Sequence, residues 1–182
     1  MGADSARDAF VSLEGARLLQ FPLTGPFISI APVTTGPWYW NQLILARLVI
    51  PNNYAPWLLL SFYSVLMVIV MYLIGFLLAG KRFGLILAVI TAFSRNQIQV
   101  ATELTNPSVI GFYTALIILL FLILIKKGPS KKIGFILGLV FGLTLNTHYQ
   151  SFGLVSLLIS LLYFGRQYIP VLIQIFKGII IT

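Results

Sequence analysis

The 182-residue sequence contains no cysteine and has very little charge. The absence of cysteine excludes disulfide bonds and thiol chemistry. Charged residues make up 9% of the chain, and 12 Lys+Arg with 4 Asp+Glu are too few to cover the exterior of a soluble domain. Hydrophobic residues make up 59%, and the mean hydropathy is +0.99. These values predict an all-α fold, a polytopic transmembrane helical bundle.

Several sequence motifs of soluble enzymes are also missing. The chain has no Gly-rich phosphate loop, no nucleophile elbow and no His-Glu zinc motif, so soluble nucleotide chemistry has no support. With one histidine and no cysteine, a zinc site of the usual kind is unsupported as well. The net charge of +8 comes from short basic clusters at predicted helix ends, which membrane topology explains better than nucleic-acid binding.

Long apolar runs predict the membrane-crossing helices. Residues 57–79 and 109–125 each come near the roughly 20 apolar residues that a bilayer requires. Residues 83–93 are too short unless the polar stretch after them continues the helix. Residues 133–164 are too long for one crossing and have a polar centre, so we expect two short crossings with a tight polar connection. The expected connections on the other side are a tight turn at Lys81-Arg82 and a basic loop over 126–132.

The first 56 residues predict a surface loop with two helices. Residues 4–20 form a helix that is too polar to cross a bilayer, and Pro22 ends it. Its expected apolar face carries Ala6, Phe10, Leu13 and Ala16, and the opposite face carries Asp4, Arg7 and Asp8. After a loop over 21–37, residues 38–50 form a short helix whose first aromatic residues prefer the headgroup level.

The sequence also predicts one domain that is incomplete. Because both ends of the chain look cut, we expect residues 1–182 to be a single fragment of a larger transmembrane domain, truncated at both ends. Residues 3–56 would form its first extracytoplasmic loop and residues 57–182 its transmembrane helices.

The charges separate into two groups along this topology. The side without acids carries Lys81, Arg82, Lys126, Lys127, Lys131, Lys132 and Arg166, and the positive-inside rule assigns it to the cytoplasm. The opposite side collects three polar segments, 4–53, 94–107 and 146–151, with all four acids and the only histidine. We therefore expect a multi-pass protein of the cell (plasma or inner) membrane whose polar segments meet on the extracytoplasmic face.

The first polar segment offers two carboxylates one helical turn apart. Asp4 and Asp8 are compatible with a solvated helix start, stabilised by the helix dipole. The alternative is a general base or a metal-binding carboxylate, with Arg7 binding a phosphate. Tyr39, in the second surface helix, fits an interfacial anchor or a substrate contact.

The other two polar segments supply the remaining candidates. Arg95, Glu103 and Asn106 fit either a helix end at the interface or side chains that face a cavity. His148, with Tyr149 and Gln150, fits either a satisfied structural histidine or a substrate-contacting group.

At this point the order of short motifs resembles a known family, the GT-C-fold glycosyltransferases that use polyprenyl-phosphate sugars. The resemblance is to relatives of protein mannosyltransferases and of the lipid A aminoarabinose transferase. The residues that carry it are Asp4-Ser5-Ala6-Arg7-Asp8, Gly25-Pro26, Gly36-Pro37-Trp38-Tyr39-Trp40, Ser94-Arg95, Asn106-Pro107 and the run Gly138 to His148-Tyr149.

The resemblance implies an inverting transfer of a sugar from a polyprenyl-phosphate donor to a lipid, glycan or protein acceptor. Asp4 falls at the family's acidic position, which is associated with activation of the acceptor. Arg7 or Arg95 would bind the leaving phosphate. Many relatives carry an Asp-Glu pair where this chain has Asp4-Ser5, and the helix expected before this loop is absent, so we expect the fragment to be inactive alone.

Two other classes of function remain open. A transporter or lipid flippase with interrupted helices would place polar groups near the membrane midplane. A non-catalytic assembly subunit would need only the topology. The transferase instead predicts that Asp4, Arg95 and His148 converge in one outward-facing cavity. No cofactor is certain, because the residues are compatible with a divalent metal and with none.

Overall fold

The computed structural model describes residues 2–28 and 32–182. Within these ranges the chain is helical and forms no strand beyond one isolated bridge between Phe27 and Thr34. The all-α prediction is therefore confirmed. Residues 29–31, part of the expected loop over 21–37, lie outside the described ranges.

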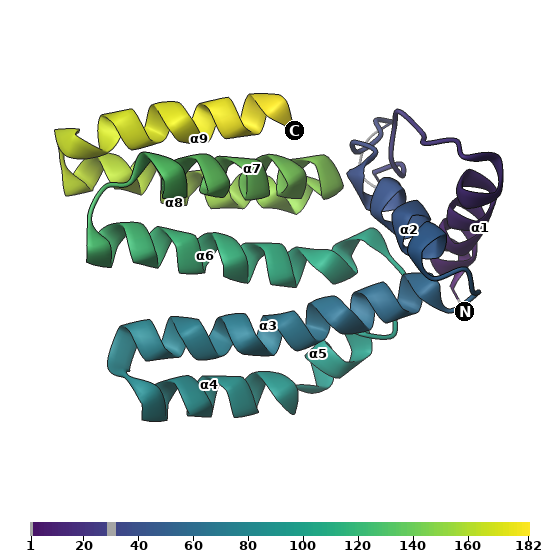
Figure 1. The fold of residues 1–182 in the computed structure, drawn as a ribbon, viewed down its shortest axis with the longest axis horizontal. Helices are drawn as coiled ribbons and strands as arrows, with labels where there is room; N and C mark the ends of the chain where they lie inside the picture. Colours follow the sequence, from purple (N-terminus) through teal and green to yellow (C-terminus); the bar gives the residue numbers. More distant parts are fainter. Residues whose placement is uncertain (1, 29–31) are drawn as a thin grey trace.

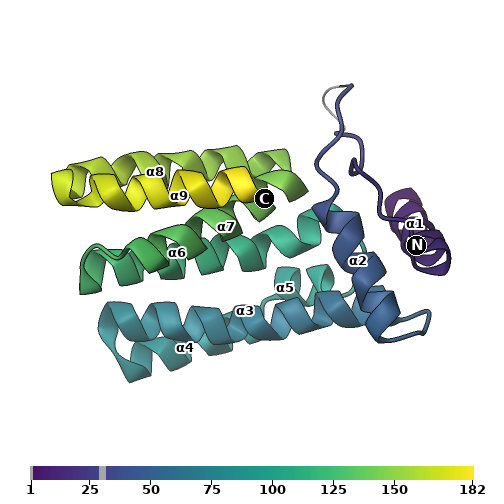
Figure 2. The same ribbon diagram turned by 45° about the horizontal axis from the view of Figure 1, so that its top comes forward.

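The helices divide into a bundle and a pair that lies across one end of it (Figures 1 and 2). The pair is α1 and α2, and the long helices run side by side along the longest axis (Figure 1). The elements are α1 Ala3–Leu18, α2 Trp38–Val49, α3 Ala55–Ala79, α4 Lys81–Ala92, α5 Arg95–Val100, η1 Asn106–Val109, α6 Ile110–Lys127, α7 Lys131–Thr147, η2 Tyr149–Leu154, α8 Val155–Ser160, η3 Leu161–Phe164, η4 Arg166–Tyr168 and α9 Ile169–Ile181.

Among the described residues, two helices are long and apolar enough to cross a membrane. They are Ala55–Ala79 and the continuous helix Asn106–Lys127, with mean hydropathies of 2.5 and 2.8 over 18 residues. One face of α3 leaves large apolar side chains exposed at helical spacing, namely Leu58, Phe62, Val65, Ile69, Leu73 and Phe76. A soluble protein rarely exposes so continuous an apolar stripe, so this face supports association with a membrane.

Glycines allow neighbouring helices of the bundle to approach closely. A Cβ at Gly138 of α7 would lie 2.1 Å from the carbonyl oxygen of Ile175 in α9. A Cβ at Gly75 of α3 would lie 2.7 Å from the Cα of Gly84 in α4. Small residues of this kind let helix backbones make the close van der Waals contacts that drive association in lipid.

Most predicted boundaries agree with the structure to within a few residues, but the turn before α4 does not. Lys81-Arg82 was expected to form the turn, whereas these residues begin α4. The chain reverses at Gly80 instead, whose φ of 85° is open to glycine at little cost.

Two conditional predictions for the later helices have opposite outcomes. The polar stretch after residue 93 does not continue α4, because α4 ends at Ala92 and α5 begins separately at Arg95. The predicted break within 133–164 is confirmed. α7 ends at Thr147, and His148 has an extended backbone before η2.

The apolar face that the sequence predicts on α1 is not the face that packs against α2. Its buried residues are small or polar, Ser5, Asp8, Ser12 and Gly15. Phe10 and Leu13, which were expected to share the apolar face of a surface helix, are exposed. Gly15 allows α1 to pack closely against α2, since a Cβ at this position would lie 2.4 Å from Cδ1 of Ile44 in α2. The helix therefore packs through its small residues and leaves its apolar face uncovered by the described part of the chain.

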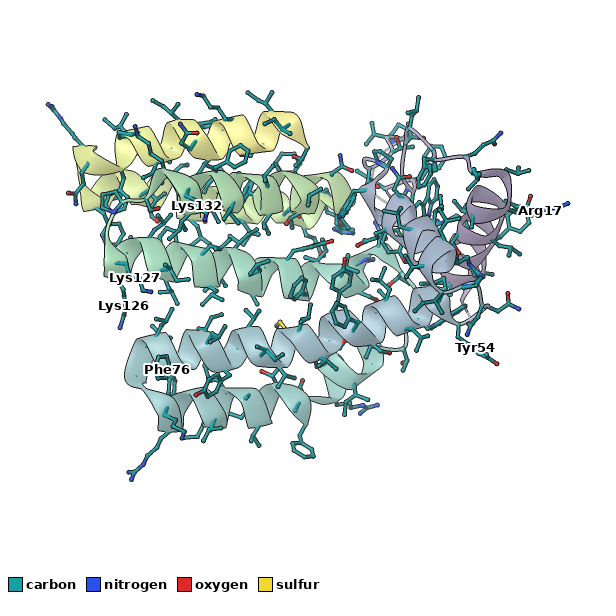
Figure 3. All side chains as sticks on the ribbon, in the orientation of Figure 1. Arg17, Tyr54, Phe76, Lys126, Lys127 and Lys132 are labelled. Carbon is teal, nitrogen blue, oxygen red and sulfur yellow. The ribbon has the colours of Figure 1, made fainter. Side chains whose placement is uncertain are left out.

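The two ends of the bundle carry different charges. Lys126 and Lys127 lie at the end far from α1 and α2, whereas Arg17 and Tyr54 lie at the other end (Figure 3). The acids Asp4, Asp8 and Glu14 belong to α1 at that second end. The structure thus separates the acids from the lysines of the α6–α7 connection in the way that the charge pattern predicts.

Candidate functional site

Parts of the three polar segments meet in one cavity beside α1. Its volume is about 170 Å³, and it is lined by Asp4, Arg7, Phe27, Ile28, Thr35, Thr105, Asn106, Pro107, His148 and Tyr149. The sequence predicted that Asp4 and His148 converge, although 144 residues separate them in the chain, and both line this cavity. The prediction for Arg95 is wrong, because its side chain does not line the cavity.

Arg7 joins the two carboxylates of α1. Its Nη1 donates to Oδ1 of Asp4 at 2.8 Å, and its Nε donates to Oδ1 of Asp8 at 2.8 Å. Burial by itself would lower the pKa of the Arg7 guanidinium, but the two carboxylates raise it overall. The guanidinium also lies 5.9 Å from the centre of the Trp40 ring, a cation–π distance. Arg7 is therefore a fixed positive charge at the wall of the cavity.

The two carboxylates differ sharply in exposure. The Asp4 side chain is 66% exposed, whereas the Asp8 side chain is fully buried. Only Asp4 lines the cavity. Asp8 does not, and its Oδ1 accepts a hydrogen bond from the indole Nε1 of Trp40 at 2.9 Å. Burial raises the pKa of Asp8, and its hydrogen bonds from Arg7 and Trp40 offset part of that rise. Asp8 thus orients Arg7, and Asp4 is the carboxylate that a ligand can reach.

Tyr39 is a buried neighbour of Asp8 that does not face the cavity. Its side chain is fully buried in α2, and burial followed by the negative charge of Asp8 raises the pKa of its hydroxyl. Neither the Tyr39 hydroxyl nor Oδ2 of Asp8 has a partner of good hydrogen-bond geometry among the described residues. Tyr39 is therefore a buried neighbour of the site and does not contact a ligand in the cavity.

His148 presents one nitrogen to the cavity in a defined protonation state. Its Nδ1 accepts the backbone N–H of Gln150 at 3.2 Å, so the proton of the neutral ring lies on Nε2. Burial lowers the pKa of His148, which keeps the ring neutral at pH 7. Tyr149 stacks on it with ring centroids 4.4 Å apart. The pair offers a ligand an N–H donor beside an aromatic surface.

Polar contacts between distant segments fix the walls of the cavity. Asn106 Nδ2 donates to the carbonyl oxygen of Thr147 at 3.3 Å, which joins η1 to the end of α7. Asn146 Oδ1 accepts the backbone N–H of Trp38 at 2.9 Å, which joins the same end to the start of α2. Gly36 is required beside it, because a Cβ there would lie 2.2 Å from Oδ1 of Asn146.

Besides Asp8 and Tyr39, three further predicted site residues do not line the cavity. Arg95 is exposed on α5, and Glu103 is exposed and accepts a hydrogen bond from the side chain of Gln99. The Gln150 side chain is exposed, and only its backbone takes part, through His148. Sequence reasoning placed all three on the correct polar segments but could not resolve which way each local turn directs its side chains.

Sequence reasoning also missed residues that build the site. Thr35 and Thr105 line the cavity, and Trp40 and Asn146 hold its parts together. Asn146 belongs to the polar run 146–151, so its position in an otherwise apolar helix was an available signal. The two threonines carry no such signal, since threonine is ordinary in loops.

The carboxylates do not gather into a metal-binding group. Within residues 2–28 and 32–182, no three side chains of His, Cys, Asp or Glu come together as metal ligands. Asp8 already accepts hydrogen bonds from Arg7 and Trp40. Arg7 places a guanidinium charge at this cavity.

Comparisons with protein-family models, with curated proteins and with solved structures found no match for this chain.

Proposed function

We propose that this chain is part of a membrane glycosyltransferase that transfers a sugar from a polyprenyl-phosphate donor on the extracytoplasmic face. The observation that carries the proposal is the cavity in which an accessible carboxylate, Asp4, lies with the Arg7 guanidinium and the His148 imidazole. These are the groups that such a transfer needs: a proton acceptor, a positive charge for the phosphate and a donor for the sugar.

In the proposed reaction, an acceptor hydroxyl attacks the anomeric carbon of the donor sugar. Its proton passes to the Asp4 carboxylate as the new C–O bond forms. The bond between the anomeric carbon and the phosphate oxygen breaks, and its electron pair leaves with the phosphate. Arg7 stabilises that developing negative charge, and Nε2–H of His148 binds a hydroxyl of the sugar.

A second, apolar cavity suits the lipid part of such a donor. Its volume is about 470 Å³, and it lies between α2 and α3, lined mostly by apolar side chains such as Leu45, Leu58 and Phe62. Trp38 also lines this cavity, and the backbone N–H of Trp38 donates a hydrogen bond to Oδ1 of Asn146 near the end of α7. We propose that α3 and α6 cross the bilayer within a polytopic bundle of the GT-C type, with this groove open to lipid.

The test is sugar transfer by the full-length protein in membranes. Labelled sugar from polyprenyl-phosphate donors would be followed in wild type, Asp4→Asn and Glu14→Gln at matched expression. Loss of a proton acceptor costs about 100-fold or more in rate, so we expect Asp4→Asn to lose transfer. Glu14, an α1 carboxylate outside the cavity, serves as the matched control, and Glu14→Gln should retain transfer.

Two results would contradict the proposal. Equal transfer by wild type and Asp4→Asn would remove Asp4 from the mechanism. Absence of transfer by correctly folded wild type with every donor would favour the transporter or the assembly subunit instead.

A further inference from the structure

Arg47 of α2 is a buried arginine whose hydrogen-bond partners are all neutral. Only 7% of it is exposed. Its Nε donates to Oγ of Ser12 at 2.8 Å, and its Nη2 donates to the carbonyl oxygen of Ala9 at 3.3 Å. Its Nη1 donates to the carbonyl oxygen of Asn52 and to Oδ1 of Asn53, each at 3.4 Å.

No acid compensates this charge within the described chain. The ion pairs there involve Arg7 and Arg17, and no carboxylate of the described residues lies within 4.0 Å of Arg47. Burial lowers the pKa of Arg47, but an arginine remains charged at every physiological pH. A buried charge is costly unless an opposite charge or strong hydrogen bonds compensate it, and three of these four bonds are long.

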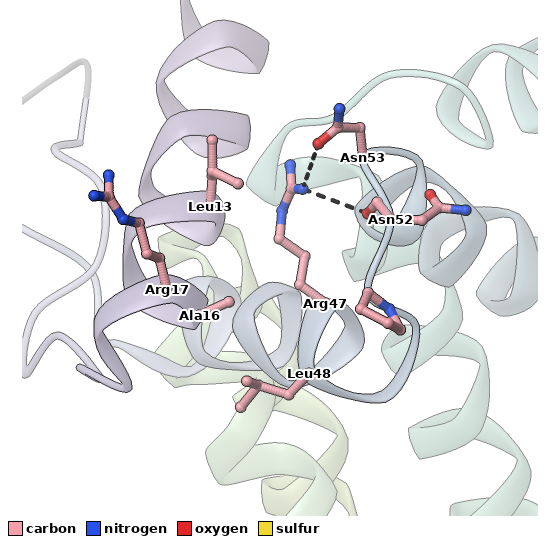
Figure 4. A pocket seen from close by; sticks show the side chains of 8 residues that line it. Leu13, Ala16, Arg17, Arg47, Leu48, Asn52 and Asn53 are labelled. Atoms are coloured by element: carbon pink, nitrogen blue, oxygen red, sulfur yellow. Dashed lines mark hydrogen bonds between the residues drawn. The ribbon is translucent and has the colours of Figure 1, made fainter.

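This guanidinium borders a cavity of about 320 Å³ (Figure 4). Leu13, Ala16, Arg17, Arg47, Leu48, Pro51, Asn52 and Asn53 line it. Figure 4 shows Arg47 directed toward Asn52 and Asn53, and Arg17 turned outward on the other side of Leu13. The Arg17 side chain is 74% exposed, and its contact with Glu14 is long, at 3.7 Å. Such an exposed side chain changes rotamer within nanoseconds, so Arg17 can close over a bound anion.

We propose that this cavity binds a phosphate group. The four hydrogen bonds of Arg47 use four of its five N–H groups, so one N–H and the positive charge remain for a ligand. A phosphate would accept from that N–H and supply the opposite charge that the described chain does not place beside Arg47. The side-chain N–H groups of Asn52 and Asn53 add neutral donors at the rim. The volume is at the lower end of ligand sites, which suits a headgroup-sized molecule.

Two sources of such a phosphate fit the surroundings of the cavity, a lipid headgroup and a free phosphate. Leu13 and Leu48 line the cavity and are each more than 40% exposed, so a phospholipid could keep its acyl chains against them. The site does not include Asp4 or His148 and does not depend on the proposed transferase activity.

The bonds of Arg47 also tie α2 to α1, so the test must measure binding as well as stability. Full-length protein in a neutral detergent would be titrated with inorganic phosphate and, separately, with short-chain phosphatidylglycerol. Arg47→Gln removes the buried donor, Arg17→Gln removes the exposed one, and Arg82→Gln removes an exposed arginine on α4 as the charge-matched control.

We expect wild type to bind at least one of the two probes. Arg47→Gln should weaken that binding about tenfold or more, since it removes charge-assisted hydrogen bonds. Arg17→Gln should weaken it about two- to fivefold, as befits an exposed charge. Arg82→Gln should bind as wild type does.

The two probes distinguish the sources. Much tighter binding of the lipid identifies a headgroup site, and equal binding of both identifies a site for phosphate itself. Thermal unfolding would show whether Arg47→Gln is folded. If it is not, Arg47→Lys would be used in its place, because it keeps the charge and loses the planar guanidinium. Absence of binding by wild type, or binding that neither arginine substitution weakens, would overturn the proposal.

Discussion

At the scale of single residues, burial separates two carboxylates that the sequence presents as equivalent. Asp4 and Asp8 lie one turn apart, yet Asp4 is accessible in the cavity and Asp8 is enclosed with Arg7 and Trp40. Both contact the same guanidinium, so the buried carboxylate positions Arg7 for the exposed one. The different roles of Asp4 and Asp8 follow from the burial of their side chains, which composition and spacing could not have predicted.

Asp8 should give the folded protein a characteristic pH dependence. Its pKa in the folded state is raised above 3.8, chiefly by burial, so the folded state binds this proton more tightly than the unfolded state does. The stabilisation from Asp8 is therefore present below its unfolded pKa and is lost as pH rises through the folded pKa. Thermal unfolding in detergent should show this loss in wild type and not in Asp8→Asn.

Asp8→Asn should also fold, since its amide oxygen can still accept from Arg7 and Trp40. If wild type and Asp8→Asn shared the same curve of unfolding temperature against pH, Asp8 would not have the raised pKa that its burial implies.

At the scale of elements, contacts between the ends of α2, α7 and η1 hold the cavity. Helix positions were predictable because apolar run length and proline positions decide them, and α2 was expected over 38–50 and found over Trp38–Val49. The face through which α1 contacts α2 was not predictable in the same way. Periodicity identified the apolar face that carries Phe10, which is exposed, but it did not identify the small residues Ser12 and Gly15 as the buried contact.

The link between α7 and α2 should depend on one side chain. Asn146→Ala removes the acceptor of the Trp38 backbone N–H, and we expect a loss of about 1 kcal/mol in the free energy of unfolding. Asn96→Ala, at an exposed position on α5, should cost little. Equal unfolding temperatures for both variants would show that this hydrogen bond does not stabilise the junction.

Close packing of α7 against α9 should make Gly138 intolerant of any side chain. Its missing Cβ position lies 2.1 Å from the Ile175 carbonyl oxygen, so Gly138→Ala must push the helices apart, at about 1–3 kcal/mol. Gly111→Ala, in α6, meets no atom within 4 Å and should be neutral or slightly stabilising. Thermal unfolding of the two variants compares them directly, and a tolerated Gly138→Ala would contradict the packing.

At the scale of the whole molecule, the charge distribution gives the bundle two distinct ends. The candidate cavity, α1 and α2 lie at one end, and Lys126 and Lys127 lie at the other (Figures 1 and 3). This separation was predictable because each apolar run moves the chain from one end to the other. The convergence of Asp4 with His148 followed from it, whereas the outward position of Arg95 depended on the separate start of α5.

The proposed transfer on the extracytoplasmic face depends on the sidedness of the bundle, and the absence of cysteine makes that sidedness directly measurable. Tyr54→Cys and Lys127→Cys would be introduced singly into a cysteine-free background of the full-length protein, at exposed positions near opposite ends. A membrane-impermeant maleimide should label Tyr54→Cys in intact cells and Lys127→Cys only after permeabilisation. Labelling of both positions in intact cells, or of Lys127→Cys alone, would contradict an extracytoplasmic cavity.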